Sequence, residues 1–339
     1  MARSDGGTRA QASRSPPGRS AGGYMGDTTA PRGEAQALAV EQRWSYRWRV
    51  ARSGALMTLP ALLVIALFTI YPFWYALNES LHLSSPILGR RFVGLDNFRN
   101  VISSPYFLDA ARTTLIFAAI AVPVLVVLGV LVALLLNERF PGNTLLRAGM
   151  LLPWAIPASV VGVIWKWVFL DSWGALNAGL YSLGLIDNYI SWLTTPWLAR
   201  FAVIVAFTWS QLPLVAILLL AALQAIPDEL YEAAAIDGAS AVSRFWAVTL
   251  PGIRPMLVIV TLYEILMALN VFDITYAMTG GGPGTATSLL TYYIWAETFK
   301  MLNFGNGAAL AVVIALLALA FIAAIVRALP KEALLGEHA

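Results

Sequence analysis

Long uncharged apolar runs are the feature of this sequence that most restricts its fold. A helix needs roughly 20 residues to cross the hydrocarbon core of a bilayer, and several runs approach or exceed that length. They are 54–77, 115–136, 148–165, 201–226 and 308–326. A sixth run, 255–278, is apolar apart from Glu264 and Asp273. The sequence therefore predicts an all-α integral membrane protein with six transmembrane helices.

The composition supports lipid as the solvent of most of the chain. Hydrophobic residues make up 59% of it and charged residues only 12%, outside the range usual for a soluble domain. A membrane barrel would instead show short segments that alternate between apolar and polar residues. Five prolines in or near the runs do not oppose the helical interpretation, because neighbouring helices re-satisfy the freed carbonyls in membrane proteins; they are Pro72, Pro123, Pro153, Pro157 and Pro213.

Several chemistries are excluded by what the sequence does not contain. It has no cysteine and only two histidines, so we assign no catalytic residue, disulfide or Cys/His metal site. It also has no phosphate-binding Gly-x-x-x-x-Gly-Lys-Ser/Thr loop, and we expect no cofactor in this chain. The basic residues flank the apolar runs and form no aromatic-interleaved patch, which argues against nucleic acid as a partner.

The pattern of charge predicts the organisation of the chain. Residues 1–50 are polar and rich in Gly, Ser and Arg, and we expect a disordered cytoplasmic tail. Residues 51–110 hold the first transmembrane helix and an external loop, 111–328 hold five further helices, and 329–339 form a second tail. Basic residues before the first run indicate that both termini are cytoplasmic.

The most polar internal stretch, 224–254, lies between the fourth and fifth runs. Asp228 and Glu229 follow Pro227, which is typical of a helix start, and Gly238 is a natural place for that helix to end. A second short helix is expected over 241–250, ending before Pro251. The stretch thus predicts helix, turn, helix, although an ordinary connecting loop is the alternative.

The same stretch carries a spaced motif of small, acidic and apolar residues. Its members in register are Glu232, Ala233, Ala234, Gly238, Leu250 and Pro251, with Asp237 beside the glycine and Val248 where the motif has Ile. It resembles the Glu-Ala-Ala signature of the permeases of bacterial ABC importers. The resemblance implies a type I importer permease fold with a cytoplasmic coupling helix in segment 228–251.

A second motif narrows the resemblance to one branch. Thr279-Gly-Gly-Gly-Pro283 is similar to a loop of the carbohydrate importers, which include the maltose and glycerol phosphate permeases, and Phe304-Gly305 agrees more loosely. Glycine and proline also cluster in any tight loop, which is the structural alternative. The resemblance favours import of a sugar or sugar-like solute.

The resemblance also implies partners and a location. A complete importer of this kind has a second permease chain, expected to be homologous but different, two cytoplasmic ATPase subunits that use ATP and Mg, and an external solute-binding protein. The location implied is the plasma membrane of a bacterium, where the chain would be a multi-pass protein in contact with lipid.

Polar side chains inside the runs are candidates for the transport pathway, because a polar group in lipid is costly and should face protein or water. Tyr263, Asn270 and Asp273 fall on one side of a continuous fifth helix, with Glu264 nearly opposite Asp273.

In the fourth run, Thr208, Trp209 and Gln211 combine an aromatic face with hydrogen-bonding groups. By resemblance, Trp209 and Asn270 match places where the maltose permease contacts sugar, and Gln211 does not. For each residue, hydrogen bonding between helices is the alternative.

Two other functions remain open from the sequence. One is an importer of the same architecture for another solute class. The other is a membrane-embedded enzyme acting on a lipid-linked sugar, but its carboxylate candidates Asp109, Asp171 and Asp187 are scattered along the chain.

Overall fold

The computed structural model describes residues 52–138 and 140–328. In these residues, five helices are long and apolar enough to cross a membrane, and a sixth crossing is possible if one bent helix pair counts as a span. The five are Arg52–Ser80, Pro105–Asn137, Pro196–Gln224, Ala241–Leu269 and Phe304–Ala324. The predicted tails 1–50 and 329–339 lie outside the described residues. The prediction of a mainly helical membrane protein is confirmed.

The first helix includes a π-helical turn, η1 (Ala66–Ile70), followed by α2 (Tyr71–Ser80). Residues 52–67 belong to a separate structural unit, within which they are helical with exposed side chains. The second unit begins at Phe68 and contains all the elements described below. Exposure of so apolar a helix is expected where lipid replaces water around it.

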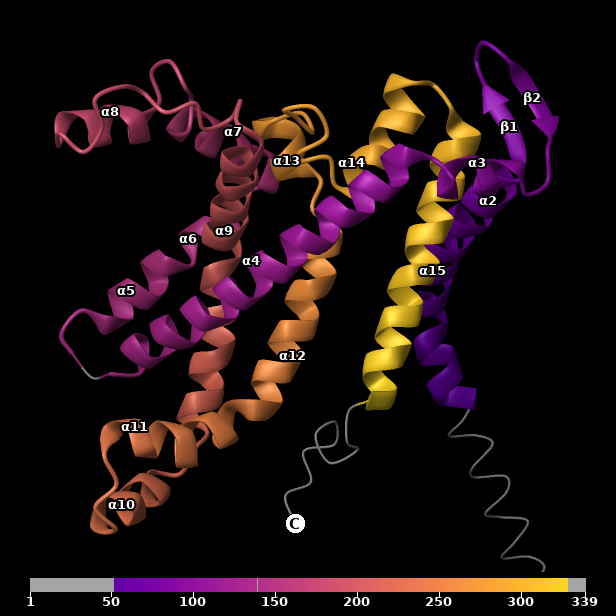
Figure 1. Ribbon diagram of the computed structural model, residues 1–339. Helices are drawn as coiled ribbons and strands as arrows, with labels where there is room; N and C mark the ends of the chain where they lie inside the picture. The colour runs from indigo at the N-terminus through magenta and orange to yellow at the C-terminus, as the bar shows by residue number, and fades with distance from the viewer. Residues whose placement is uncertain (1–51, 139, 329–339) are drawn as a thin grey trace, which may run out of the picture. The chain divides into compact units, whose positions relative to one another are not determined.

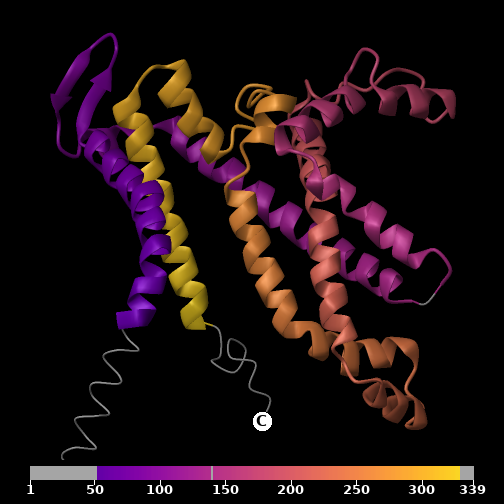
Figure 2. The ribbon, with the colours of Figure 1, turned by 180° about the vertical axis from the view of Figure 1, so that it is seen from behind.

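A small hairpin follows α2 in the chain and contacts the C-terminal helix. Strands β1 (His82–Ser85) and β2 (Gly89–Phe92) are antiparallel, with His82 opposite Phe92, and α3 (Asp96–Ile102) comes next. The last helix, α15 (Phe304–Ala328), packs against α2, and both views show the two side by side (Figures 1 and 2). A Cβ at Gly305 would lie 2.2 Å from the carbonyl oxygen of His82, so the approach of α15 to β1 requires glycine.

Three long helices form the centre of the second unit. They are α4 (Pro105–Asn137), α9 (Pro196–Gln224) and α12 (Leu250–Leu269), and α4 packs on both of the others (Figure 1). Many of their buried side chains belong to one apolar cluster, in which the rings of Phe117 and Phe207 meet edge to face at 5.3 Å. At Gly129 of α4 a Cβ would lie 2.4 Å from Cγ1 of Val215 on α9. The missing side chain lets the two helices approach closely, as small residues do between membrane helices.

The predicted span 148–165 is not one continuous helix. The chain forms α5 (Asn143–Met150), α6 (Leu152–Ala155) and α7 (Ala158–Val168), and the axis bends by 96° between α6 and α7. Ile156 at the bend is extended, with ψ 131°, because the proline that follows restricts its backbone, and Pro157 itself cannot donate a hydrogen bond to the preceding turn. Helix α7 packs instead against α13 (Asp273–Met278).

The predicted fifth span, 255–278, has different limits at both ends. The expected stop before Pro251 is wrong, because α11 (Ala241–Arg244) continues through the π-helical turn η2 (Phe245–Thr249) into α12. In η2 the Leu250 N–H bonds five residues back to Phe245, a wider turn that lets the helix continue past the proline. At the other end α12 stops at Leu269 and α13 is a separate helix, so residues 263–273 do not form one helical face.

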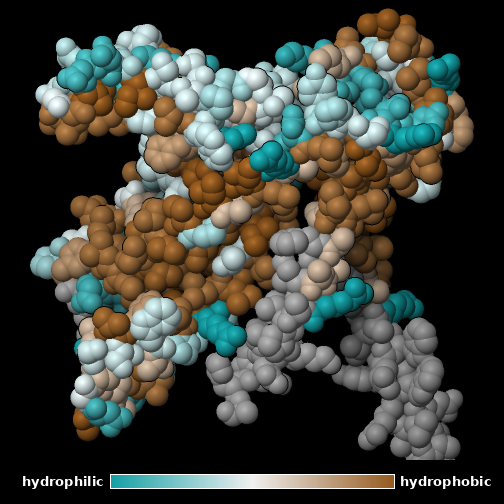
Figure 3. All heavy atoms as spheres, viewed as in Figure 1, coloured by the Kyte–Doolittle hydropathy of each residue, from teal (hydrophilic) through white to brown (hydrophobic). Residues whose placement is uncertain are grey.

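Shorter elements complete the described chain: α8 (Ala175–Ser182), α10 (Asp228–Ile236), α14 (Leu290–Trp295) and η3 (Ala296–Lys300). Helix α14 is tied to α4 by the Leu290 N–H, which donates to the Thr114 hydroxyl at 2.9 Å. Hydrophobic side chains gather over α4 and α5, whereas α10 and α11 carry a more hydrophilic surface (Figure 3). Exposed leucines on α4 and α5, such as Leu131 and Leu145, match a lipid-facing surface.

Candidate coupling segment and transport pathway

The segment that contains the Glu-Ala-Ala motif folds as a helix, a tight turn and a second helix. Pro227 is extended and precedes α10, whose first turn carries Asp228 and Glu229. Acidic side chains stabilise this end of a helix because they face the positive end of its dipole. The predicted start of the helix is confirmed.

The turn after α10 is a Schellman motif built on Gly238. The glycine has φ +75°, its N–H donates to Ala235 at 3.0 Å, and the next N–H, of Ala239, donates to Ala234 at 2.9 Å. This pair of bonds satisfies carbonyls at the helix end and requires a left-handed residue, for which glycine has no steric cost. The predicted end of the helix at Gly238 is therefore confirmed.

The second helix is fixed at its start and along its side. The Ser240 hydroxyl accepts a bond from the Ser243 N–H at 3.2 Å, which caps α11. The Tyr231 and Thr249 hydroxyls are 3.1 Å apart and join α10 to η2. The two halves of the segment are thus held together by specific bonds.

One side of the segment is open and partly apolar. Ile236 is 86% exposed and Leu230 is 52% exposed. Of the motif residues, Glu232, Ala233, Asp237, Gly238 and Pro251 are exposed, whereas Ala234 and Leu250 are half-buried. This side of the segment therefore presents apolar and acidic side chains together to the solvent.

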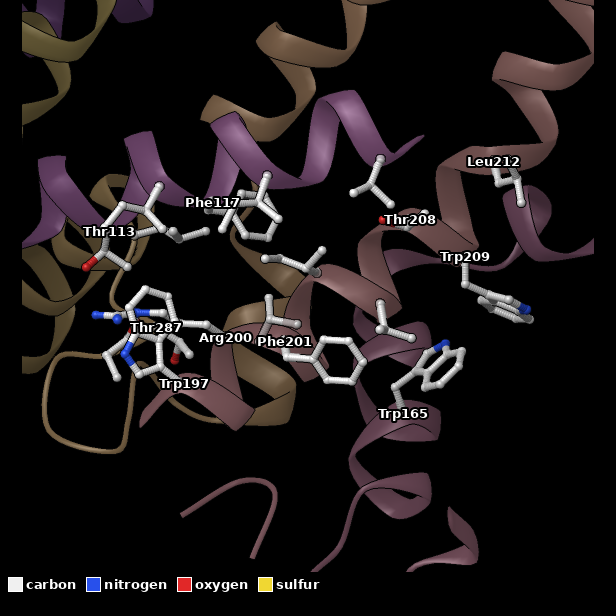
Figure 4. Close-up of a pocket in the computed structure, with 18 of the residues that line it drawn as sticks. Thr113, Phe117, Trp165, Trp197, Arg200, Phe201, Thr208, Trp209, Leu212 and Thr287 are labelled. Atoms are coloured by element: carbon white, nitrogen blue, oxygen red, sulfur yellow. The ribbon is translucent and has the colours of Figure 1, made fainter. Parts of the chain in front are cut away.

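Two of the predicted pathway residues, Thr208 and Trp209, line a cavity of about 540 Å³ between α4, α7 and α9. Trp209 packs edge to face on Trp165 of α7 at 5.7 Å (Figure 4). The Nε1 of Trp165 is buried without a hydrogen-bond partner in the described chain. The bend before α7 turns this ring inward, and hydropathy alone gave no signal of it.

The other pathway candidates do not line this cavity. Tyr263 is on α12, and Asn270 follows its last residue and donates through Nδ2 to the Leu266 carbonyl at 2.8 Å. Asp273 opens α13, and all three are exposed. Gln211 is half-buried on α9, with its Oε1 enclosed and unpartnered among the described residues. The expected single face through Tyr263, Asn270 and Asp273 is therefore divided between two helices.

Glu264 has an unusual environment. It is fully buried, and within the described residues neither carboxylate oxygen has a hydrogen-bond partner. It shares the buried side of α12 with Ile253, Val260 and Ala268, which are part of the central apolar cluster. The sequence identified Glu264 as an exception in an apolar run but placed it opposite Asp273 on one helix, which the break after Leu269 rules out.

The Thr-Gly-Gly-Gly-Pro loop is held in a compact turn by hydrogen bonds to Thr287. Gly280 and Gly281 both have positive φ, and the Thr279 and Thr287 hydroxyls are 2.6 Å apart. The Thr287 hydroxyl donates in turn to the Gly282 carbonyl at 2.7 Å. The loop is thus held in shape by its own bonds, and its glycines meet a local backbone requirement.

Long apolar helices, a broken span and a structured segment between two of them define a helical integral membrane protein. The sequence model of the family described as "Binding-protein-dependent transport system inner membrane component" matches residues 102–330. The chain belongs to this family and is a permease of a binding-protein-dependent ABC importer.

Curated relatives resemble the chain over most of its length. The trehalose/maltose transport system permease protein MalF of Thermococcus litoralis is 39% identical over 279 residues, covering 81% of this chain and 92% of the relative. The sulfoquinovosyl glycerol transport system permease protein SmoG of Agrobacterium fabrum is 37% identical over 263 residues, covering 77% and 84%. The sn-glycerol-3-phosphate permease UgpA of Yersinia pestis is 35% identical over 264 residues, covering 77% and 88%.

Among solved structures, a bacterial ABC transporter involved in the import of the acidic polysaccharide alginate has a chain of similar fold. The TM-score is 0.70 with 23% sequence identity, over 82% of this chain and 95% of that chain. At this identity the likeness shows the fold.

Proposed function

We propose that this permease carries a sugar or sugar-like solute, of the di- or oligosaccharide or glycerol phosphate type, from an external binding protein into the cytoplasm. The relatives MalF, SmoG and UgpA are named for trehalose/maltose, sulfoquinovosyl glycerol and glycerol 3-phosphate. Each of these solutes carries several hydroxyl groups on a small carbon skeleton. Such solutes need hydrogen-bond donors and acceptors, which the exposed candidates Tyr263, Asn270 and Asp273 can supply.

The observation that carries the coupling proposal is the exposed face of α10 beside its Schellman turn. Ile236 and Leu230 offer apolar contact, Glu232 offers charge, and the Gly238 turn fixes their direction. We propose that this face docks in a groove of an ATPase subunit, which binds ATP and Mg. Since α11 continues through η2 into α12, movement of the ATPase would reach the membrane helices directly.

The assembly proposed around the chain follows from this docking. Two ATPase subunits lie on the cytoplasmic side with α10, and a second, homologous permease completes the membrane part. We propose that the bent pair α5–α7 counts as one of six spans, so that both termini lie on the same side of the membrane. Basic residues before the first span favour the cytoplasm for that side, and the Thr279–Pro283 loop would then lie outside. The membrane is the bacterial plasma membrane.

Within the membrane, we propose that the solute passes the exposed side of α12 and the polar stretch of α9. Tyr263 and Asn270 are seven residues apart and so face nearly the same way, and both are exposed. Asp273, Thr208, Trp209 and Gln211 remain candidates on the neighbouring elements. Opening of this path alternately to each side would be the rocking motion general to helical transporters.

Reconstitution tests the solute class. The chain is placed in proteoliposomes with its partner permease, ATPase subunits and binding protein, and uptake of labelled trehalose, maltose, glycerol 3-phosphate and an amino acid is compared with ATP inside. We expect ATP-dependent uptake of at least one hydroxylated solute. Uptake of the amino acid alone would establish the rival assignment, an importer of the same architecture for another solute class.

A further inference from the structure

We propose that the groove between α4 and α9 is a lipid site that binds one acyl chain of an anionic phospholipid, with the phosphate at Arg200. This site lies apart from the coupling segment and from Tyr263, Asn270 and Asp273 of the proposed solute path, whereas Thr208 and Trp209 line it. The leaflet concerned, the outer one, rests on the orientation proposed above.

The walls of the groove are almost entirely apolar. Ile120, Val124 and Leu128 line it from α4, and Phe201, Ile204 and Leu212 line it from α9. The buried hydroxyl of Thr208 and the buried Nε1 of Trp165 are enclosed by protein and offer nothing to a ligand. A hydroxylated solute would lose its bonds to water here without replacement, at a cost of a few kcal/mol for each group. A hydrocarbon chain loses no bonds.

The groove has the length of an acyl chain. Its α4 wall runs from Thr113 to Leu128, and these two residues lie about 22 Å apart along the axis at the α-helical rise. One leaflet of the hydrocarbon core is about 15 Å thick, half of the roughly 30 Å of the whole core. A single extended chain can therefore lie along this wall.

The charge of the groove is confined to one end (Figure 4). There Arg200, Trp197 and Thr287 lie together near Thr113, while Trp165, Trp209 and Leu212 lie at the other end. Arg200 donates through Nε to the Ala286 carbonyl at 2.7 Å, and its guanidinium carbon is 4.6 Å from the centre of the Trp197 ring. These contacts fix the direction of the guanidinium.

The remaining guanidinium nitrogens of Arg200 are available for an anion. In the described part of the chain no carboxylate forms an ion pair with Arg200, and no hydrogen bond uses its Nη1 or Nη2. Two such nitrogens match the geometry of a phosphate. Trp197, 61% exposed beside it, is the kind of residue that lies at the level of lipid headgroups. A fixed cation at the end of an apolar groove complements an anionic lipid.

Native mass spectrometry of the full chain tests the site. Delipidated protein in detergent is titrated with a phosphatidylglycerol that has 16-carbon chains, and Arg200→Gln is compared with Arg99→Gln, an exposed arginine on α3 outside the groove. We expect Arg200→Gln to bind the first lipid about tenfold more weakly, since loss of a charge-assisted bond is worth a factor of that order. Arg99→Gln should bind like the wild type.

A second pair of variants tests the apolar part. Ile120→Trp fills the groove, and Leu131→Trp places the same ring on the exposed side of α4. We expect Ile120→Trp to remove the first tightly bound lipid and Leu131→Trp to retain it. If Ile120→Trp does not accumulate, the wild-type protein is tested instead with phosphatidylglycerols of 16-carbon and 8-carbon chains. We expect tighter binding of the 16-carbon lipid, because its chain fills more of the groove.

Three results would overturn the proposal. They are unchanged lipid binding in Arg200→Gln, equal affinity for short and long chains, and loss of the bound lipid when the permease assembles with its partner chain. The last result would mean that a helix of the partner permease covers the groove in the importer.

Discussion

Gly238 offers the sharpest test of a single residue. A Cβ there would meet no atom within 4 Å, so only the backbone angle of +75° opposes a side chain. We expect Gly238→Val to strain the turn by about 1 kcal/mol or more and to lower uptake and ATPase co-purification more than permease abundance. Gly238→Asn is the matched control, because asparagine tolerates the left-handed region, and it should retain most uptake. A valine variant with full uptake and full ATPase association would show that the turn is not needed for coupling.

Asn270, just past the end of α12, and Glu264, within it, are expected to differ in their effect on transport. Asn270 is exposed and uses one amide hydrogen on Leu266, so its Oδ1 and second hydrogen remain free for a solute. Glu264 is enclosed and has no such access. We expect Asn270→Ala to weaken transport more than Glu264→Ala when uptake at limiting solute is divided by permease abundance. Equal uptake by Asn270→Ala and the wild type would move the solute path elsewhere.

These residues also show where sequence reasoning works. Gly238 and Pro227 were predicted correctly because caps and turns depend on the chain immediately around them. The buried position of Trp165 was not predicted, because it follows from a bend whose direction is set by packing against α13. The roles of Asn270 and Gln211 stay predictions.

The crossing of α4 and α9 depends on a missing side chain at Gly129. We expect Gly129→Ala to bring a Cβ against the fully buried Val215 and to destabilise the protein by about 1–3 kcal/mol, typical of overpacking. Thermal unfolding in detergent measures this, with Gly149→Ala as control because that position has no atom within 4 Å. The double variant Gly129→Ala/Val215→Ala should recover part of the loss, and a failure to do so would place the strain elsewhere.

Helix limits were predicted less well than helix existence. Hydropathy identifies a run that lipid will accept, but it contains no information on the direction of the backbone. Pro157 is a local signal of a bend, although from the sequence alone we interpret it as a proline that a membrane helix tolerates. Helix α13, which packs against α7, lies within the run 255–278 and is not distinguished from it by hydropathy. After the break at Leu269, the Val271 carbonyl accepts a hydrogen bond from the Thr291 hydroxyl, 20 residues further along the chain. Such a contact cannot be predicted from the local sequence.

Orientation of the whole chain is testable because the sequence contains no cysteine. Gly282→Cys in the closed loop and Ala235→Cys in α10 each introduce a single thiol. We expect a membrane-impermeant maleimide to label Cys at position 282 in intact cells and to label position 235 only after the membrane is opened. The cysteine-free parent controls for background, and labelling of 282 solely from inside would show that the six-span topology is wrong.

The unbroken helix from Ala241 to Leu269 has a mechanical consequence. The helix turns between α11 and α12 (Figures 1 and 2). Its longer part, α12, has 20 residues and is about 30 Å long at the α-helical rise. A tilt of α12 by about 5° about its cytoplasmic end moves its far end by about 3 Å. Asn270 follows that end by one residue, so a displacement of α11 by a nucleotide-driven subunit would be transmitted to the level of the proposed solute path.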